Sequence, residues 1–236
     1  MSKRVREAML RYMNDWQQHA NAGWRHGKWL ELEDSITHKL GQVLRADPKD
    51  IGIAASLSTG MHSLMATFYK PNEKRNKIIM LSSEFTSDIL VSQSWIETHK
   101  IDPNALLLAD VSDKIPSVAT SNVVKLIEEN KETVSIVAMS LVSSHFSHYY
   151  ELDQIRQACK KYGILLFIDL AHSLGCVPIN LTELDVDAAY MSSSKYMNSG
   201  PGCVGAIYIN PRHTGVKPGL RGWFGTDRAV LTMQNP

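Results

Sequence analysis

Seven short apolar runs, several of them separated by amphipathic segments, constrain what this chain can fold into. Runs of this length that are rich in branched residues are typical of buried strands, and the segments between them have helical periodicity. Strands that are apolar on both faces belong to largely parallel sheets covered by helices on both sides. We therefore predict an α/β fold with a mostly parallel seven-stranded sheet between helices. The predicted strands are Ile51–Ala55, Lys77–Leu81, Ala105–Ala109, Val134–Met139, Ile164–Ile168, Ala188–Met191 and Cys203–Ile209.

Two helices are predicted before the first strand. The first has apolar residues at three- and four-residue steps, which is the spacing of one buried helical face. These residues are Val5, Met9, Tyr12, Met13 and Trp16. The second runs over residues 32–44 and ends before Asp47-Pro48, because proline resists helix continuation. Further helices are predicted over residues 61–69, 86–98, 121–130 and 151–162. We expect a helical lead-in over residues 1–48 and one large domain over residues 49–236.

Charge and composition narrow the function classes. The 236 residues include 25 Lys+Arg and 24 Asp+Glu, so the formal net charge of +1 gives no electrostatic case for nucleic acid or an anionic membrane. No apolar stretch approaches the roughly 20 residues of a membrane-spanning helix, and no apolar core follows the basic first residues. The three cysteines, Cys159, Cys176 and Cys203, have no metal-ligand spacing. We therefore expect no metal site and a reducing, cytoplasmic location.

An aspartate and a lysine stand directly after two predicted strands, where open α/β sheets bind their ligands. Asp169 follows the strand 164–168, and burying a carboxylate there is costly unless a positive partner is present. A protonated pyridine nitrogen is such a partner, although an aspartate here also suits a helix N-cap. Lys195 follows the strand 188–191 and three serines, a setting in which a lysine can form a Schiff base. Lysine is also among the commonest surface residues, so an ordinary surface lysine is the alternative.

Two further strand ends carry polar and aromatic residues. Ser58 lies between the strand 51–55 and an apolar helix, so hydroxyl and free N–H groups there form either a phosphate site or a simple cap. Phe85 and Asp88 follow the strand 77–81, where a ring can stack on a planar ligand or instead pack in the core. Taken together, the residues at the four strand ends predict a site for one aromatic ligand that carries a phosphate.

Several segments, in order along nearly the whole chain, resemble the kynureninase family. They are Phe167–Pro178, Val186–Ala189, Ser194–Gly202, Ser63–Met65, Phe68–Pro71, Lys74-Arg75 and Gly222–Gly225. The resemblance implies a fold-type-I pyridoxal 5′-phosphate enzyme of the aminotransferase class V group that works as a homodimer. Its implied reaction is the hydrolysis of the Cβ–Cγ bond of L-kynurenine or 3-hydroxykynurenine. The products are L-alanine and anthranilate or 3-hydroxyanthranilate, in tryptophan catabolism and NAD biosynthesis.

The resemblance also implies roles for individual residues. Lys195 corresponds to the Schiff-base lysine and Asp169 to the partner of the pyridine nitrogen. Trp223 corresponds to a tryptophan that reaches the cofactor across the dimer interface. The remaining cofactor-binding positions are Leu57, Ser58, Phe85, Thr86, Ser87, Asp88, Ser140, His172 and Ser194. His145 and Tyr149 are candidates, by location only, for activating the attacking water.

Four departures from the family pattern bear on activity. Ser194 stands where the family usually has a tyrosine that reaches the phosphate, and a serine has a shorter reach. Thr226 replaces a histidine. An N-terminal glycine-rich segment and a smaller C-terminal domain are expected to be absent. The alternatives to a kynureninase are therefore another class V enzyme, such as a desulfurase or an epimerase-like protein, or a truncated and impaired cofactor-binding paralogue.

Overall fold

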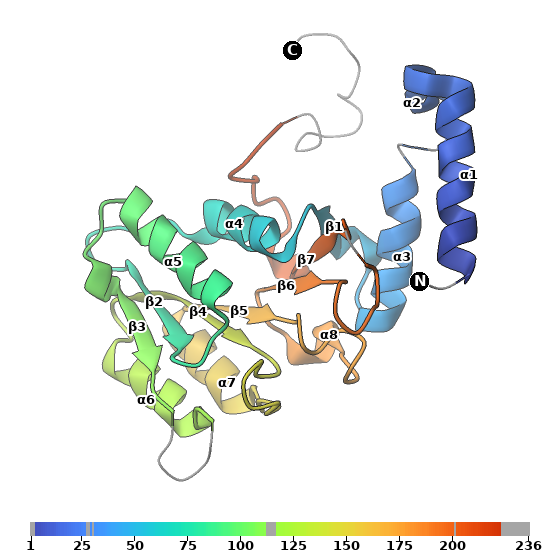
Figure 1. Cartoon of the computed structure of the whole chain (residues 1–236). Helices are drawn as coiled ribbons and strands as arrows, with labels where there is room; N and C mark the ends of the chain where they lie inside the picture. Colours follow the sequence, from blue (N-terminus) through green and yellow to red (C-terminus); the bar gives the residue numbers. More distant parts are fainter. Residues whose placement is uncertain (1–2, 27–28, 30, 112–116, 201, 223–236) are drawn as a thin grey trace.

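The computed structural model describes residues 3–26, 29, 31–111, 117–200 and 202–222 and contains one seven-stranded sheet (Figure 1). The strands are β1 (Ile51–Ala54), β2 (Lys77–Leu81), β3 (Leu106–Ala109), β4 (Val134–Ser140), β5 (Leu165–Asp169), β6 (Ala188–Ser192) and β7 (Gly205–Ile209). Their order is β1-β7-β6-β5-β4-β2-β3. Every neighbouring pair is parallel except those of β7, which runs antiparallel to β1 and β6. The predicted mostly parallel sheet is confirmed.

Helices cover both faces of the sheet. They are α1 (Lys3–His19), α2 (Gly23–His26), α3 (Leu32–Leu44), α4 (Leu57–Phe68), α5 (Thr86–Thr98), α6 (Thr120–Glu129), α7 (Asp153–Tyr162) and α8 (Leu181–Leu184). Helices α4 and α5 lie over one face and α6 and α7 over the other (Figure 1). Alternate residues of a strand point to opposite faces. In β2, Ile78 and Met80 accordingly pack with α4 and α5, while Ile79 and Leu81 pack on the opposite face.

The first helix departs from its predicted packing. Helix α1 forms as the periodicity predicts, but it has no buried residue among those described. Its apolar positions are 42% exposed at Val5 and 66% exposed at Trp16, so the prediction that they form a buried face is wrong. The helix packs mainly on the short helical segments that follow it, η1 (Ala20–Ala22) and α2. Periodicity specifies that residues share a face, but the surface that covers this face must come from elsewhere. Among the described residues, no helix is long and apolar enough to cross a membrane.

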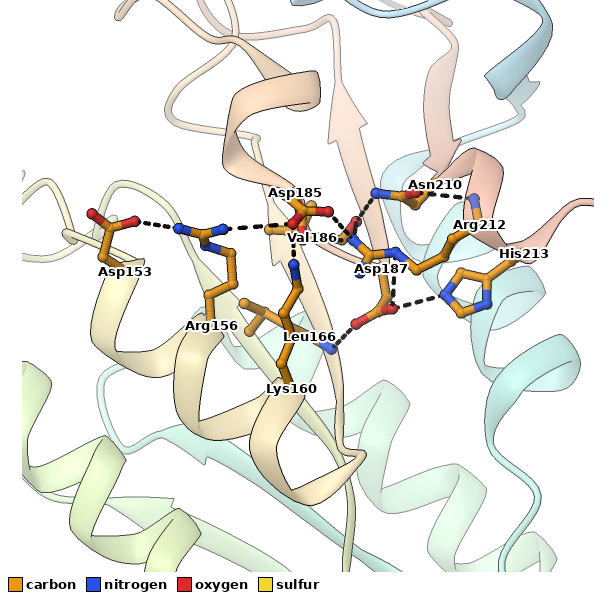
Figure 2. Close-up of polar contacts among 10 residues, drawn as sticks. All are labelled: Asp153, Arg156, Lys160, Leu166, Asp185, Val186, Asp187, Asn210, Arg212 and His213. Atoms are coloured by element: carbon orange, nitrogen blue, oxygen red, sulfur yellow. Dashed lines mark hydrogen bonds and ion pairs between the residues drawn. The ribbon is translucent and has the colours of Figure 1, made fainter.

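An ion-pair network ties the amino end of β6 to the helices beside it (Figure 2). Asp185 pairs with Arg212 and Lys160, and its Oδ2 atom lies 3.5 Å from Nη1 of Arg156. Asp187 accepts the backbone N–H of Leu166 at 2.9 Å. Because β5 and β6 are parallel, this network lies at the edge opposite the one where ligands bind in such sheets. We therefore assign it to holding the strands together.

Candidate active site

The candidate site lies at the carboxyl edge of the sheet. Strands β2, β4, β5 and β6 are parallel, and β1 shares their direction because both β1 and β6 are antiparallel to β7. The segments that leave these strands therefore converge at one edge. The register pairs Ser140, the last residue of β4, with Asp169, the last of β5. Asp169 is in turn paired with Tyr190 of β6.

Three buried carboxylates form the centre of this edge. Glu84, Asp88 and Asp169 are 4%, 0% and 3% exposed, and one oxygen of each lies within 4.8 Å of an oxygen of the other two. Burial raises the pKa of all three carboxyl groups, because the charged form loses its hydration. For Asp88, burial and the neighbouring Glu84 raise the pKa to about 7. A positive charge nearby favours the ionised forms and so opposes this effect of burial.

Hydrogen bonds fix the orientation of Asp169 and Asp88. Asp169 accepts the backbone N–H of Ala171 through Oδ1 at 2.7 Å. Asp88 accepts the hydroxyl of Tyr190, itself fully buried, through Oδ2 at 3.0 Å. The other oxygen of Asp88, Oδ1, is buried and has no hydrogen-bond partner among the described residues. A buried acceptor without a partner is costly, so this atom is available to a ligand.

Lys195 carries a positive charge that acts on both Asp88 and Asp169. Its charge lowers the pKa values of Asp88 and Asp169, against the larger opposing effect of burial. Its Nζ atom lies 5.6 Å from the centroid of the Phe85 ring. That ring is 48% exposed and is therefore accessible to a planar ligand. A lysine amine lies beside an exposed aromatic face, and its charge acts on two buried carboxyl groups at the same edge of the sheet.

Two helix N-termini lie side by side at the same edge. The hydroxyls of Ser58, in the first turn of α4, and Ser87, in the first turn of α5, are 2.7 Å apart. Helix N-termini with free N–H groups and hydroxyls bind anions such as phosphate. Gly205 allows this placement, since a Cβ atom there would lie 2.7 Å from the carbonyl carbon of Ser56 and 2.9 Å from the nitrogen of Leu57. The start of α4 is therefore pressed directly onto β7.

Two histidines lie near the lysine and the carboxylates. His172 is half-buried, and within the part of the chain that the structure describes its buried Nδ1 atom has no hydrogen-bond partner. Burial, followed by the charges of Lys195 and His145, lowers its pKa. A charge on His145 lowers the pKa of Glu84, against the larger opposing effect of burial. Tyr149, the other candidate for water activation, lines a hollow of about 310 Å³ with Arg45 and Pro178.

Most of the predicted site residues are gathered at this edge, although their roles stay predictions. Leu57 and Thr86 begin α4 and α5, and the Ser194 hydroxyl lies 2.7 Å from that of Ser192. Trp223 and Thr226 lie outside the described residues. Sequence reasoning missed Glu84 and Tyr190. Glu84 follows the same strand as Phe85 and was available to the same reasoning, whereas Tyr190 falls in a strand whose apolar pattern indicates only core.

Comparisons with known proteins identify the family and the fold. Residues 1–222 match the aminotransferase class-V family. The chain belongs to that family. Similar curated proteins include kynureninases of Geobacillus thermodenitrificans, with 31% identity, and of Shouchella clausii, with 30% identity. Each match covers 97% of this chain but 53% of the relative, so the chain spans about half the length of these relatives. The kynureninase of Dictyostelium discoideum is 29% identical over 93% of this chain and 51% of its own length.

Solved structures of the same fold include a cystine C-S lyase in complex with its reaction product cysteine persulfide. That structure has a TM-score of 0.77 at 18% identity and covers 90% of this chain and 55% of its own. A cysteine desulfurase from Thermococcus onnurineus has a TM-score of 0.64 at 20% identity, covering 77% and 43%. These likenesses concern the fold, which is the fold-type-I architecture predicted from the sequence. Family membership implies pyridoxal 5′-phosphate as the cofactor.

Proposed function

We propose that this chain is the cofactor-binding part of a kynureninase-like hydrolase that cleaves the Cβ–Cγ bond of L-kynurenine or 3-hydroxykynurenine. The observation that carries the proposal is the position of Lys195 beside the Phe85 ring, at the sheet edge where the buried Asp169 ends β5. The kynureninases among its relatives support the choice of substrate class. Under this proposal the large domain covers residues 49–236 and residues 1–48 form a helical lead-in.

The described residues fit pyridoxal 5′-phosphate. The buried cluster around Asp169 needs a positive partner, and the protonated pyridine nitrogen supplies one. Asp88 Oδ1 and His172 Nδ1, which have no hydrogen-bond partner among the residues described, offer further polar contacts. Ser58 and Ser87, at the two helix N-termini, suit the phosphate. The cofactor would be held covalently by Lys195, with Phe85 against its ring.

Each residue then has a definite task. When bound, the cofactor withdraws electrons from the α-carbon of an amino-acid substrate. Asp169 keeps a proton on the pyridine nitrogen, which that withdrawal requires. Lys195 would hold the cofactor and would also be the base that takes the proton from the substrate α-carbon. We assign His172 to a contact with the cofactor and Ser194 to the phosphate side, as the sequence predicts. A homodimer with Trp223 contributed across the interface, working in the cytoplasm, completes the proposal.

A substrate comparison tests the proposed reaction. Purified protein loaded with pyridoxal 5′-phosphate is incubated with L-kynurenine, 3-hydroxykynurenine and L-cysteine, and anthranilate fluorescence, alanine and sulfide are measured. We expect alanine and the anthranilate in equal amounts from the first two and no sulfide from the third. Sulfide release would assign the chain to a desulfurase-like reaction instead. Cofactor binding without turnover of any of the three would support the impaired paralogue.

A further inference from the structure

Helices α4 and α5 pack against each other over one face of the sheet, and side-chain hydrogen bonds join them at two levels (Figure 1). At the N-termini, the hydroxyl oxygens of Ser58 and Ser87 are 2.7 Å apart. Further along the two helices, the indole Nε1–H of Trp95 donates to Nδ1 of His62 at 3.0 Å. The first pair belongs to the proposed phosphate site, and the second begins about one helical turn beyond it on α4.

Ring contacts set the orientation of the Trp95 indole. His99, directly after α5, stacks on the Trp95 ring with centroids 5.8 Å apart and an interplanar angle of 29°. The His99 ring also meets Tyr69, directly after α4, edge to face at 5.6 Å. Trp95 is partly buried against the apolar core beneath the two helices. The indole plane is held by these contacts, so the direction of its N–H is set before any ligand binds.

The hydrogen bond specifies which nitrogen of His62 carries a proton. An indole N–H can only donate, so Nδ1 of His62 accepts and carries no hydrogen. The proton of the neutral imidazole is therefore on Nε2. Asparagine offers an acceptor at the same place, because its Oδ1 atom is attached to Cγ just as Nδ1 of histidine is. Leucine has the branched shape of asparagine without the acceptor.

The N-termini of α4 and α5 repel each other until an anion is bound. Each carries a partial positive charge from the aligned backbone dipoles, and the two lie side by side. His62 lies four residues after Ser58, and Trp95 lies eight residues after Ser87, so each pair shares one side of its helix. A bond between the two deeper residues therefore resists both separation and rotation of the two serines.

We propose that His62 and Trp95 are positioning residues that clamp α4 to α5 and so hold Ser58 and Ser87 at the spacing that binds the cofactor phosphate. The proposal rests on the phosphate site of the proposed function and makes no use of the kynurenine reaction. Neither member of the clamp touches the cofactor in this assignment. The clamp keeps the phosphate site assembled in the cofactor-free protein, so binding does not have to bring the helices together.

A matched pair of substitutions at residue 62 tests the clamp. His62→Leu removes the acceptor, whereas His62→Asn keeps one in a side chain of the same shape. The probes are pyridoxal 5′-phosphate and pyridoxal, which lacks the phosphate, and the visible cofactor band measures both dissociation constants. We expect His62→Leu to weaken pyridoxal 5′-phosphate binding by about fivefold and to leave pyridoxal binding within about twofold of the parent. His62→Asn should restore the parent affinity.

Two further variants complete the comparison. Trp95→Phe loses the N–H but keeps an aromatic ring, so it should match His62→Leu, and combining the two should add little. His38→Leu, at an exposed histidine of α3, is the control and should change neither dissociation constant. Parent-like pyridoxal 5′-phosphate affinity in His62→Leu would overturn the proposal. So would an equal loss for pyridoxal, or a His62→Asn variant no better than His62→Leu.

Inorganic phosphate separates the clamp from the proposed function. In isothermal titration of the cofactor-free protein, phosphate uses the two helix N-termini but not Lys195. We expect the parent to bind it, and both Ser58→Ala and His62→Leu to bind it more weakly. A parent that binds phosphate in this way but forms no cofactor band would count against the proposed function alone, and the phosphate affinity of His62→Leu would still decide the clamp. A parent that binds neither would overturn both.

Discussion

Asp88 should make the cofactor-free protein less stable as the pH rises. Its folded pKa is about 7, against an ordinary value of 3.8, because the carboxyl group is buried beside Glu84. As the pH rises above about 4, the unfolded chain ionises this group while the folded chain resists, so stability is lost up to about pH 7 and changes little beyond it. Between pH 5 and pH 8 the loss from this one group is ~3 kcal/mol, taking about 1.4 kcal/mol for each pKa unit.

The variant Asp88→Asn removes that titration while keeping an oxygen to accept the Tyr190 hydroxyl. Urea unfolding of cofactor-free parent and variant at pH 5 and pH 8 measures the effect. We expect the parent to lose ~3 kcal/mol more than the variant over this interval, and the exposed control Asp110→Asn to behave like the parent. Equal slopes in parent and Asp88→Asn would refute the reasoning. A parent that gains stability relative to the variant toward pH 8 would mean that Asp88 is ionised in the folded state at low pH.

Two further predictions concern the stability of the fold and the phosphate side of the candidate site. Arg75→Ala should lower the free energy of unfolding by about 2–4 kcal/mol, and Arg75→Lys should recover only part of it, because the guanidinium fork serves several acceptors at once. Its acceptors are the backbone oxygens of Lys131, Val134, Tyr162 and Gly163. A loss below about 0.5 kcal/mol in urea unfolding would contradict this. Ser194→Tyr should tighten pyridoxal 5′-phosphate binding by about tenfold in equilibrium dialysis, since a phenol reaches further than a serine hydroxyl. Unchanged affinity would show that the tyrosine position does not face the phosphate.

Much of the fold follows from local pattern. Strand β2 and helix α5 have the predicted bounds, because each is a single periodic run between clear breaks. The antiparallel direction of β7 was not predicted, since its apolar run reads the same in either direction. The exposure of α1 was also missed. The periodicity of a helical sequence indicates which residues share a face, but not whether another part of the protein covers that face.

The candidate site was likewise predicted only in part. Asp169, Lys195 and Phe85 were predicted because they follow strands, and sheet topology alone brings strand ends together. Tyr190 lies inside β6, and its hydroxyl reaches Asp88 only through tertiary packing. Glu84 becomes informative once its contacts with Ser140 are known. Pairings between side chains on different strands depend on register and rotamers, which a single sequence does not specify.

Covalent capture of the cofactor by Lys195 tests the central claim most directly. The protein is incubated with pyridoxal 5′-phosphate, its visible absorption is recorded, and borohydride reduction is followed by peptide mass spectrometry. We expect a visible band in the parent that reduction removes, a phosphopyridoxyl group on the peptide containing Lys195, and neither signal in Lys195→Ala. A labelled lysine elsewhere in the chain, or no band in well-folded parent protein, would contradict the account.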